Sequence, residues 1–110
     1  MATEQSVVDF ILDQAAGAGD LRARKMFGEY ALYCNEKTVA FICDNRLFMK
    51  HSAADAAFKD ACTEAPPYPG AKNYLDVPEE KWEDREWLVS FIRETAAVLP
   101  LPKPKKPRKS

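Results

Sequence analysis

The sequence predicts a single α+β domain in which one antiparallel β-meander sheet carries helices packed on one face. Two helical patterns, at residues 6–16 and 84–99, flank a stretch at residues 25–51 in which apolar residues alternate with polar ones. A sheet that is apolar on one side needs a cover, which the helices supply. The length of 110 residues and the hydrophobic fraction of 46% fit one folded domain with its own core.

The first helix is expected over residues 6–16, because apolar residues recur there at the spacing i, i+3, i+4, i+7 that places them on one helix face. These residues are Val8, Ile11, Leu12 and Ala15. Ser6 and Asp9 have the spacing of a capping pair, and Gly17 and Gly19 mark the end of the helix.

Three strands are expected at residues 26–34, 39–43 and 47–50, where β-branched and aromatic residues are frequent. The breaks at residues 35–37 and 44–46 contain Asn and Asp, which tolerate the positive φ angles of hairpin turns. Gly28 is expected to mark a bulge or bend. A two-residue loop at residues 36–37 would place Cys34 opposite Val39 and Tyr30 opposite Cys43. The cysteines would then be reduced rather than disulfide-bonded.

A short second helix is expected over residues 52–61, with Ser52 and Asp55 as its capping pair. Three prolines make residues 66–70 a stiff loop, and residues 72–77 could add an edge strand. Asp84 is expected to cap a final helix that ends at Pro100. The inward-facing residues of this helix would be Leu88, Phe91, Ile92, Thr95 and Leu99.

The charge is divided unevenly along the chain, although the formal net charge is only −1. The last ten residues hold five of the sixteen Lys and Arg and none of the seventeen acids, so the body carries −6 and the end +5. We therefore expect a domain at residues 1–99 and a flexible basic tail at residues 100–110, where alternating prolines prevent a helix or a core.

Catalysis and metal binding are not expected. The single histidine, His51, has no recognisable nucleophile or orienting partner, and the three cysteines lack the spacing of a zinc site. The acids at residues 79–86 are better explained as helix N-terminal residues, which the helix dipole favours. No cofactor, metal, small-molecule substrate or membrane contact is expected, and the chain has neither a signal peptide nor a spanning segment. It should be cytoplasmic.

Two basic clusters are candidates for nucleic-acid binding, since cations that contact phosphates release counterions. One precedes the first expected strand and would otherwise be a solvated loop edge; it contains Arg22, Arg24 and Lys25. The other lies in the tail, where it could equally serve solubility, and contains Lys103, Lys105, Lys106, Arg108 and Lys109. Tyr30, Tyr33 and Tyr68 are candidates for contacts with a partner.

Residues 24–33, Arg-Lys-Met-Phe-Gly-Glu-Tyr-Ala-Leu-Tyr, and residues 41–50, Phe-Ile-Cys-Asp-Asn-Arg-Leu-Phe-Met-Lys, resemble the N-terminal domain of the TfoX/Sxy family. Tyr68-Pro69-Gly70 and Val77-Pro78-Glu79-Glu80 extend the resemblance to residues 5–99. It implies an α+β domain without a known catalytic residue, in a family associated with regulation of natural competence genes. The family's second, helical C-terminal domain is not expected in this chain.

The resemblance favours a regulatory module that binds a protein of the transcription machinery, or a second copy of itself through an exposed sheet edge. Direct, sequence-independent binding of nucleic acid through the basic clusters is the alternative. A third interpretation is an enzyme or ligand-binding domain with a pocket between the loop at Tyr68 and the sheet. Loss of turnover in His51→Ala would support that interpretation.

Overall fold

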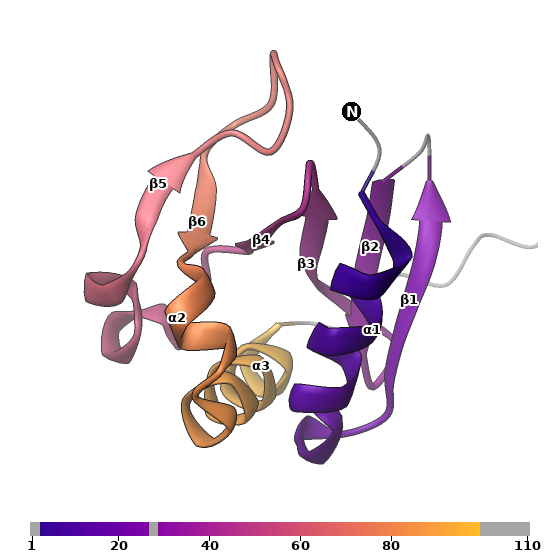
Figure 1. Ribbon diagram of the computed structural model, residues 1–110. Helices are drawn as coiled ribbons and strands as arrows, with labels where there is room; N and C mark the ends of the chain where they lie inside the picture. Colours follow the sequence, from indigo (N-terminus) through magenta and orange to yellow (C-terminus); the bar gives the residue numbers. More distant parts are fainter. Residues whose placement is uncertain (1–2, 27–28, 100–110) are drawn as a thin grey trace, which may run out of the picture.

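A six-stranded antiparallel sheet runs through the computed structural model, which describes residues 3–26 and 29–99 (Figure 1). The elements in chain order are α1 (Gln5–Gln14), the 3₁₀ turn η1 (Ala16–Ala18), β1 (Leu21–Met26), β2 (Glu29–Cys34), β3 (Lys37–Cys43), β4 (Arg46–Met49), the 3₁₀ turns η2 (Asp55–Ala57) and η3 (Lys59–Ala61), β5 (Thr63–Ala65), β6 (Tyr74–Val77), α2 (Glu79–Trp82) and α3 (Arg85–Val98). The strand order is β1-β2-β3-β4-β6-β5.

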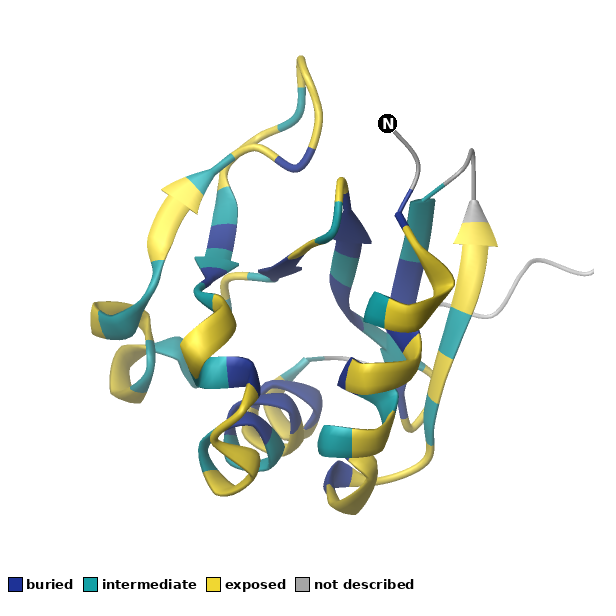
Figure 2. Cartoon of the chain, in the orientation of Figure 1, coloured by how far each residue is buried: buried dark blue, intermediate teal, exposed yellow. Residues whose placement is uncertain are grey.

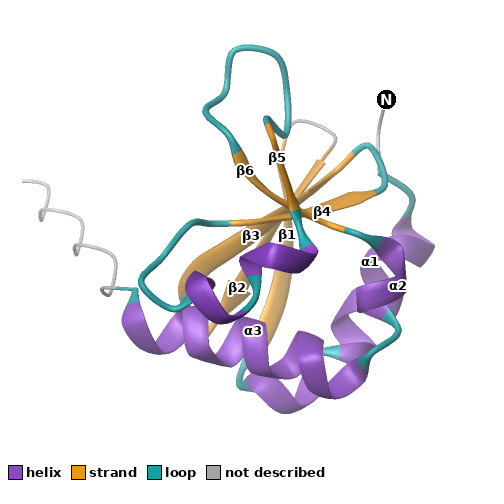
Figure 3. Ribbon diagram, turned by 90° about the vertical axis from the view of Figure 1, so that its left-hand side faces the viewer, coloured by secondary structure: helices purple, strands orange, loops and turns teal. Residues whose placement is uncertain are grey.

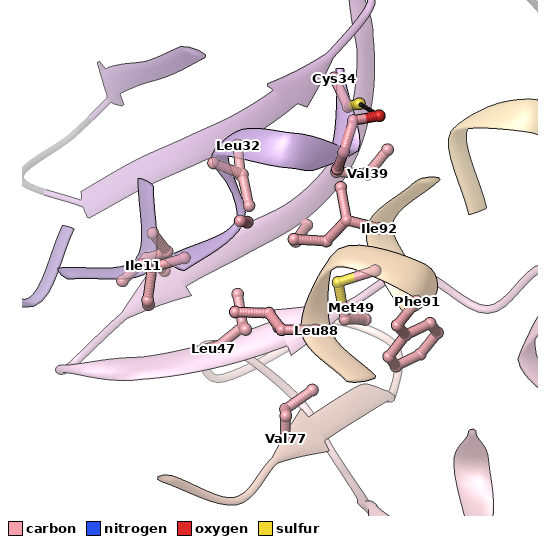
Figure 4. Packing of buried hydrophobic residues seen from close by; sticks show 14 of the residues in the cluster. Ile11, Leu32, Cys34, Val39, Leu47, Met49, Val77, Leu88, Phe91 and Ile92 are labelled. Carbon is pink, nitrogen blue, oxygen red and sulfur yellow. Dashed lines mark hydrogen bonds between the residues drawn. The ribbon is translucent and has the colours of Figure 1, made fainter. Parts of the chain in front are cut away.

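The three α-helices gather on one side of the sheet, which confirms the α+β class expected from the sequence (Figure 3). α1 contacts β1, α3 contacts β2 and β3, and the two helices contact each other. Between them lies the core, where residues of β2, β3, β4 and β6 meet residues of α1 and α3 (Figure 4). Leu32, Leu47, Leu88 and Ile92 are fully buried there. The central strands and the inner helix faces are accordingly the buried parts of the chain (Figure 2).

Both tight hairpin turns lie at the polar breaks that the sequence predicts between the strands, at residues 35–37 and 44–46. Asn35 and Glu36 have φ of 53° and 69°, and Asp44 and Asn45 have φ of 52° and 60°. Two consecutive positive φ angles are typical of a type I′ hairpin turn, whose twist matches that of the flanking strands. The predicted register was wrong, because the two-residue loop is residues 35–36 and Tyr30 pairs with Ile42. The cysteines are nevertheless free, as expected.

Two strands were not predicted. β1 contains the basic cluster that the sequence placed in a loop, and it pairs with β2 along its whole length. Leu21 and Ala23 of β1 pack against the core and alternate with Arg22 and Arg24, but Lys25 interrupts this short pattern. β5 has three residues and pairs with β6. β6 therefore lies between β4 and β5 and is not the edge strand that residues 72–77 were expected to form.

The expected second helix was also wrong, since residues 55–61 form the two 3₁₀ turns η2 and η3. Local hydrogen bonds compete with an α-helix there. The backbone N–H of Ala54 donates to Ser52 Oγ at 3.1 Å, and Asp55 Oδ2 lies 3.1 Å from Nδ1 of His51. The segment is held by Phe58, whose ring stacks on Phe91 of α3 at 4.6 Å.

The predicted cap of α3 is confirmed, whereas the predicted cap of α1 is wrong. Asp84 caps α3 as predicted, since its carboxylate accepts from the N–H of Trp87. The capping pair of Ser6 and Asp9 is wrong, because the N-cap of α1 is Glu4, which makes no side-chain cap. Gly19 follows η1 with φ of 151°, and a Cβ there would lie 2.8 Å from the side chain of Asn35. Glycine is therefore required where the chain turns into β1.

The expectations for Gly28 and for residues 100–110 fall outside the described residues. Within the described ranges, no helix has the length and apolar character needed to cross a membrane.

Candidate functional site

Strand register shows which side chains project from the sheet away from the helices. Leu32, Leu47 and Leu75 lie in the core beneath the helices. Neighbouring residues along a strand point to opposite faces, so the residues beside them define what we call the open face. Its members include Arg22, Arg24, Ala31, Tyr33, Phe41, Arg46, Phe48, Tyr74 and Asp76. No helix of the described residues lies on this face (Figure 3).

Aromatic side chains from three strands form the middle of the open face. Phe41 pairs with Phe48 in the register of β3 and β4. Phe41 also meets Tyr74 of β6 edge to face at 5.5 Å between ring centroids, so the two rings bracket the strand that carries Phe48. Phe48 is only 2% exposed, although no helix in the described part of the chain covers it. The face is therefore a packed aromatic layer, whose outer rings Phe41 and Tyr74 remain partly accessible.

A charged pair borders this layer on one side. The guanidinium of Arg46 lies over the ring of Phe48 at 5.3 Å and forms an ion pair with Asp76. Arg46 reaches β6 from β4 and shields the aromatic ring from water. These interactions tie β4 to β6 at the border of the aromatic layer.

The basic cluster of β1 is divided between the two faces of the sheet. Arg22 pairs with Tyr33 and Arg24 pairs with Ala31, so both arginines project on the open face, and both are exposed. Lys25 pairs with Tyr30 and projects on the other side. The structure therefore brings Arg22, Arg24 and Tyr33 together, and it separates them from Lys25.

The three candidate tyrosines lie in different surroundings. Tyr30 packs against the core, and its hydroxyl donates to Gln5 Oε1 at 2.9 Å. Tyr33 lies on the open face. Tyr68 is 59% exposed in the loop between β5 and β6, which projects beyond the sheet (Figure 1). The tail residues Lys103, Lys105, Lys106, Arg108 and Lys109 lie outside the described ranges.

The groups that could do chemistry are His51 and the cysteine thiols. His51 is exposed, and Asp55 Oδ2 lies 3.1 Å from its Nδ1, so it has an orienting partner that the sequence did not reveal. Burial, with smaller effects of Glu29 and Asp44, raises the pKa of the Cys43 thiol to about 11. Burial, with the nearby Asp76 and Asp55, likewise raises the pKa of Cys62 to about 11. Both thiols are therefore protonated near neutral pH and are weak nucleophiles. In residues 3–26 and 29–99, no three His, Cys, Asp or Glu side chains gather as metal ligands would.

Comparison with known proteins agrees with the resemblance seen in the sequence. Residues 13–99 match the model of the TfoX N-terminal domain. The chain belongs to this family. A protein of Spirochaeta aurantia, described as an uncharacterized 12.7 kDa protein in the trpE 5′ region, is 44% identical over 106 residues, which cover 96% of this chain and 91% of that protein.

The structure explains part of the TfoX motif in terms of the fold. Tyr30 and Leu32 of the first motif segment face the core, and Asp44 and Asn45 of the second form the β3–β4 turn. Sequence reasoning missed the aromatic residues of the open face other than Tyr33. The alternation of Phe41 with the buried Ala40 and Ile42 was the signal that could have assigned this residue to the face opposite the core.

Proposed function

We propose that this TfoX N-terminal domain is a non-enzymatic regulatory module, which acts in the cytoplasm in transcriptional control by binding a protein partner on the open face. The observation that carries the proposal is a sheet face that no described helix covers and that combines packed aromatic rings with two exposed arginines. Aromatic residues and Arg are enriched where proteins bind one another, and Lys and Glu are depleted. The family's association with competence genes supports a role in gene regulation.

The surroundings of the reactive groups support a binding role over a catalytic one. The thiols of Cys43 and Cys62 are held protonated. The open face spreads partly accessible aromatic rings and exposed arginines over several strands, which suits a macromolecular partner.

The test compares co-purification of transcription proteins with the full chain and with an open-face variant, Arg22→Glu/Arg24→Glu. The matched control is Arg93→Glu, which reverses an exposed charge on α3. We expect the wild type and the control to retain RNA polymerase or an associated activator, and the open-face variant to lose it. Equal recovery by all three proteins would show that the open face is not the docking surface.

Direct binding of nucleic acid is the second candidate, because Arg22 and Arg24 project beside Tyr33 on the same face. Guanidinium groups contact phosphates, and an aromatic ring can stack on a base. The five tail cations add to this positive charge. The acidic body opposes the wrapping of a duplex around the domain, which is why we place this function second.

Fluorescence anisotropy of a labelled random duplex separates the two candidates. The proteins are the full chain, a variant with all five tail cations replaced by Gln, and Arg22→Gln/Arg24→Gln. Salt-dependent binding that disappears only in the tail variant would assign the contact to the tail. Binding that is lost in the arginine variant would favour nucleic acid over a protein partner at the open face.

A further inference from the structure

A separate hollow of about 290 Å³ lies at the end of the sheet where β4 stops and β6 begins. Its walls come from three parts of the chain: residues just after β4, residues at the start of β6, and the residue after α3. The lining residues are Lys50, His51, Lys72, Asn73, Tyr74 and Leu99. The hollow is thus formed only in the folded chain, between the loop preceding β6 and the C-terminal end of α3.

Positive charge is concentrated in this hollow. Lys50 is half-buried, and burial together with the ammonium group of Lys72 lowers its pKa. Lys72 Nζ lies 5.9 Å from the centre of the Tyr74 ring. Within the described part of the chain, neither lysine forms an ion pair. Asp55 and Glu64 lie beside His51, another lining residue, at 3.1 Å and 3.7 Å.

Two neighbouring ammonium groups without an acid repel each other, and burial of one of them adds a desolvation cost. An anion bound between them would remove both penalties and accept charge-assisted hydrogen bonds. Asn73 and Tyr74 also line the hollow, and each carries a neutral donor group, an amide and a hydroxyl. Burial and the nearby Tyr68 raise the pKa of Tyr74, so its hydroxyl keeps its proton.

The size and the walls of the hollow select among anions. Its volume lies near the lower end of small-molecule sites, roughly 300 to 1,000 Å³, which is too small for a folded partner. Tyr74 and Leu99 supply an aromatic ring and an apolar side chain beside the cations. A phosphate monoester carries a charge of about −1.5 to −2 at neutral pH, which matches two ammonium groups better than a single carboxylate does.

We propose that the hollow is a binding site for the phosphate group of a small phosphorylated molecule, held by Lys50 and Lys72 with the organic part against Tyr74 and Leu99. This site does not depend on the function proposed for the open face. Tyr74 is the residue that the two share, since its ring also contacts Phe41. The sequence left a ligand pocket between the Tyr68 loop and the sheet as a third interpretation, but it did not single out Lys50 and Lys72, which stand 22 positions apart.

The experiment titrates the full chain with adenosine 5′-monophosphate, inorganic phosphate and uncharged adenosine, and follows backbone amide shifts by NMR. We expect adenosine 5′-monophosphate to bind with a dissociation constant of about 1 mM or tighter. Inorganic phosphate should bind more weakly and adenosine not measurably. The shifted amides should include Lys72, Asn73 and Tyr74. This mapping needs no variant, so it tests the location even if a substitution disturbs folding.

The double variant Lys50→Gln/Lys72→Gln should weaken binding of adenosine 5′-monophosphate by about tenfold or more, because two charge-assisted contacts are removed. Lys59→Gln, an exposed lysine of η3 outside the hollow, is the matched control and should bind as the wild type does. A variant with the five tail cations replaced by Gln should also bind normally, which separates the hollow from attraction to the tail.

Three results would overturn the proposal. The first is the absence of binding by either phosphate compound. The second is binding that the double variant retains or that the tail variant loses, since the anion would then lie elsewhere. The third is binding of single-stranded RNA through Lys50 and Lys72 when adenosine 5′-monophosphate does not bind, which would assign these cations to nucleic acid.

Discussion

Glu36 adopts a backbone conformation that favours glycine. Its φ is 69°, and a non-glycine residue in this left-handed region bears a steric cost of roughly 1–2 kcal/mol. Glycine would remove that steric cost. However, glycine loses more backbone conformational entropy on folding, which destabilises the folded state by roughly 0.5–1 kcal/mol. The side chain of Glu36 is exposed. We predict that Glu36→Gly raises the free energy of unfolding by about 0.5 kcal/mol in urea denaturation.

Asn45 occupies the equivalent position of the β3–β4 turn, with φ of 60°, and provides the contrast. Its Oδ1 accepts a hydrogen bond from the N–H of Glu4 at 2.8 Å. Asn45→Gly should therefore be less favourable than Glu36→Gly, because the substitution also removes this bond. If Glu36→Gly proved to be the more destabilising of the two, the backbone argument would be wrong.

The Cys43 thiol makes stability sensitive to alkaline pH. Its pKa rises from 9.0 to about 11 in the folded chain, chiefly through burial. Between these values the unfolded chain releases the proton and the folded chain keeps it, so the free energy of unfolding falls as pH rises through this interval. Cys43→Ala should make the fall shallower in urea denaturation between about pH 8 and about pH 11. Cys62 should preserve part of the slope, and an unchanged slope in Cys43→Ala would contradict the prediction.

At the scale of elements, the start of α3 depends on one side chain. Asp84 Oδ1 accepts from the N–H of Trp87 at 3.2 Å and satisfies a donor that has no partner within the helix. Asp84→Ala should lower the free energy of unfolding by about 1 kcal/mol in chemical denaturation. Glu83→Ala, one residue earlier and also exposed, is the matched control and should change stability by only a few tenths of that.

At α1, in contrast to Asp84 at α3, we expect the replacement of Ser6 to cause no loss of stability. The sequence pattern predicts a cap, but Ser6 lies inside the helix, which begins at Gln5. Ser6→Ala should therefore be neutral or slightly stabilising, since Ala favours a helix interior and no cap is lost. Thermal unfolding can measure both this variant and Asp84→Ala. A loss near 1 kcal/mol in Ser6→Ala would show that its hydroxyl supports the helix start after all.

Elements with a strong local signal could be predicted from the sequence. α3 combines apolar periodicity with the Asp84 cap, and the hairpins carry Asn and Asp at positions that need positive φ. β1 had a weaker signal, because Leu21 and Ala23 alternate with Arg22 and Arg24 but Lys25 breaks the alternation, and the strand is held by its pairing with β2. β5 is too short to have a period.

The candidate site was only partly predictable from the sequence, because it too depends on how strands pair and not on a local pattern. Arg22, Arg24 and Tyr33 could be named individually, but their common face follows from the β1–β2 register. The alternation of Phe41 with Ala40 and Ile42 marks the face opposite the core, but the predicted register was shifted, and the place of Tyr74 beside Phe41 follows from the pairing of β6 with β4. The hollow at Lys50 and Lys72 depends on the position of β6 beside β4, which no local pattern contains.

At the scale of the whole molecule, the two edges of the sheet determine whether copies can associate. An exposed edge strand offers unpaired N–H and C=O groups to another chain, and charged side chains or short length counter this pairing. β1 carries Arg22, Arg24 and Lys25 along one edge. β5, with three residues, forms the other edge. Both edges therefore have features that oppose strand addition by a second copy.

We therefore predict that the full chain is a monomer of 12.4 kDa in size-exclusion chromatography with light scattering. Arg22→Val/Arg24→Val would remove the charge repulsion and give the edge a strongly β-forming sequence, so it should associate with increasing concentration. Arg93→Val adds similar apolar surface on α3 without altering a strand and should stay monomeric. A dimeric wild type would favour the self-association that the sequence left open. Equal association of both variants would attribute it to apolar surface alone rather than to the edge of β1.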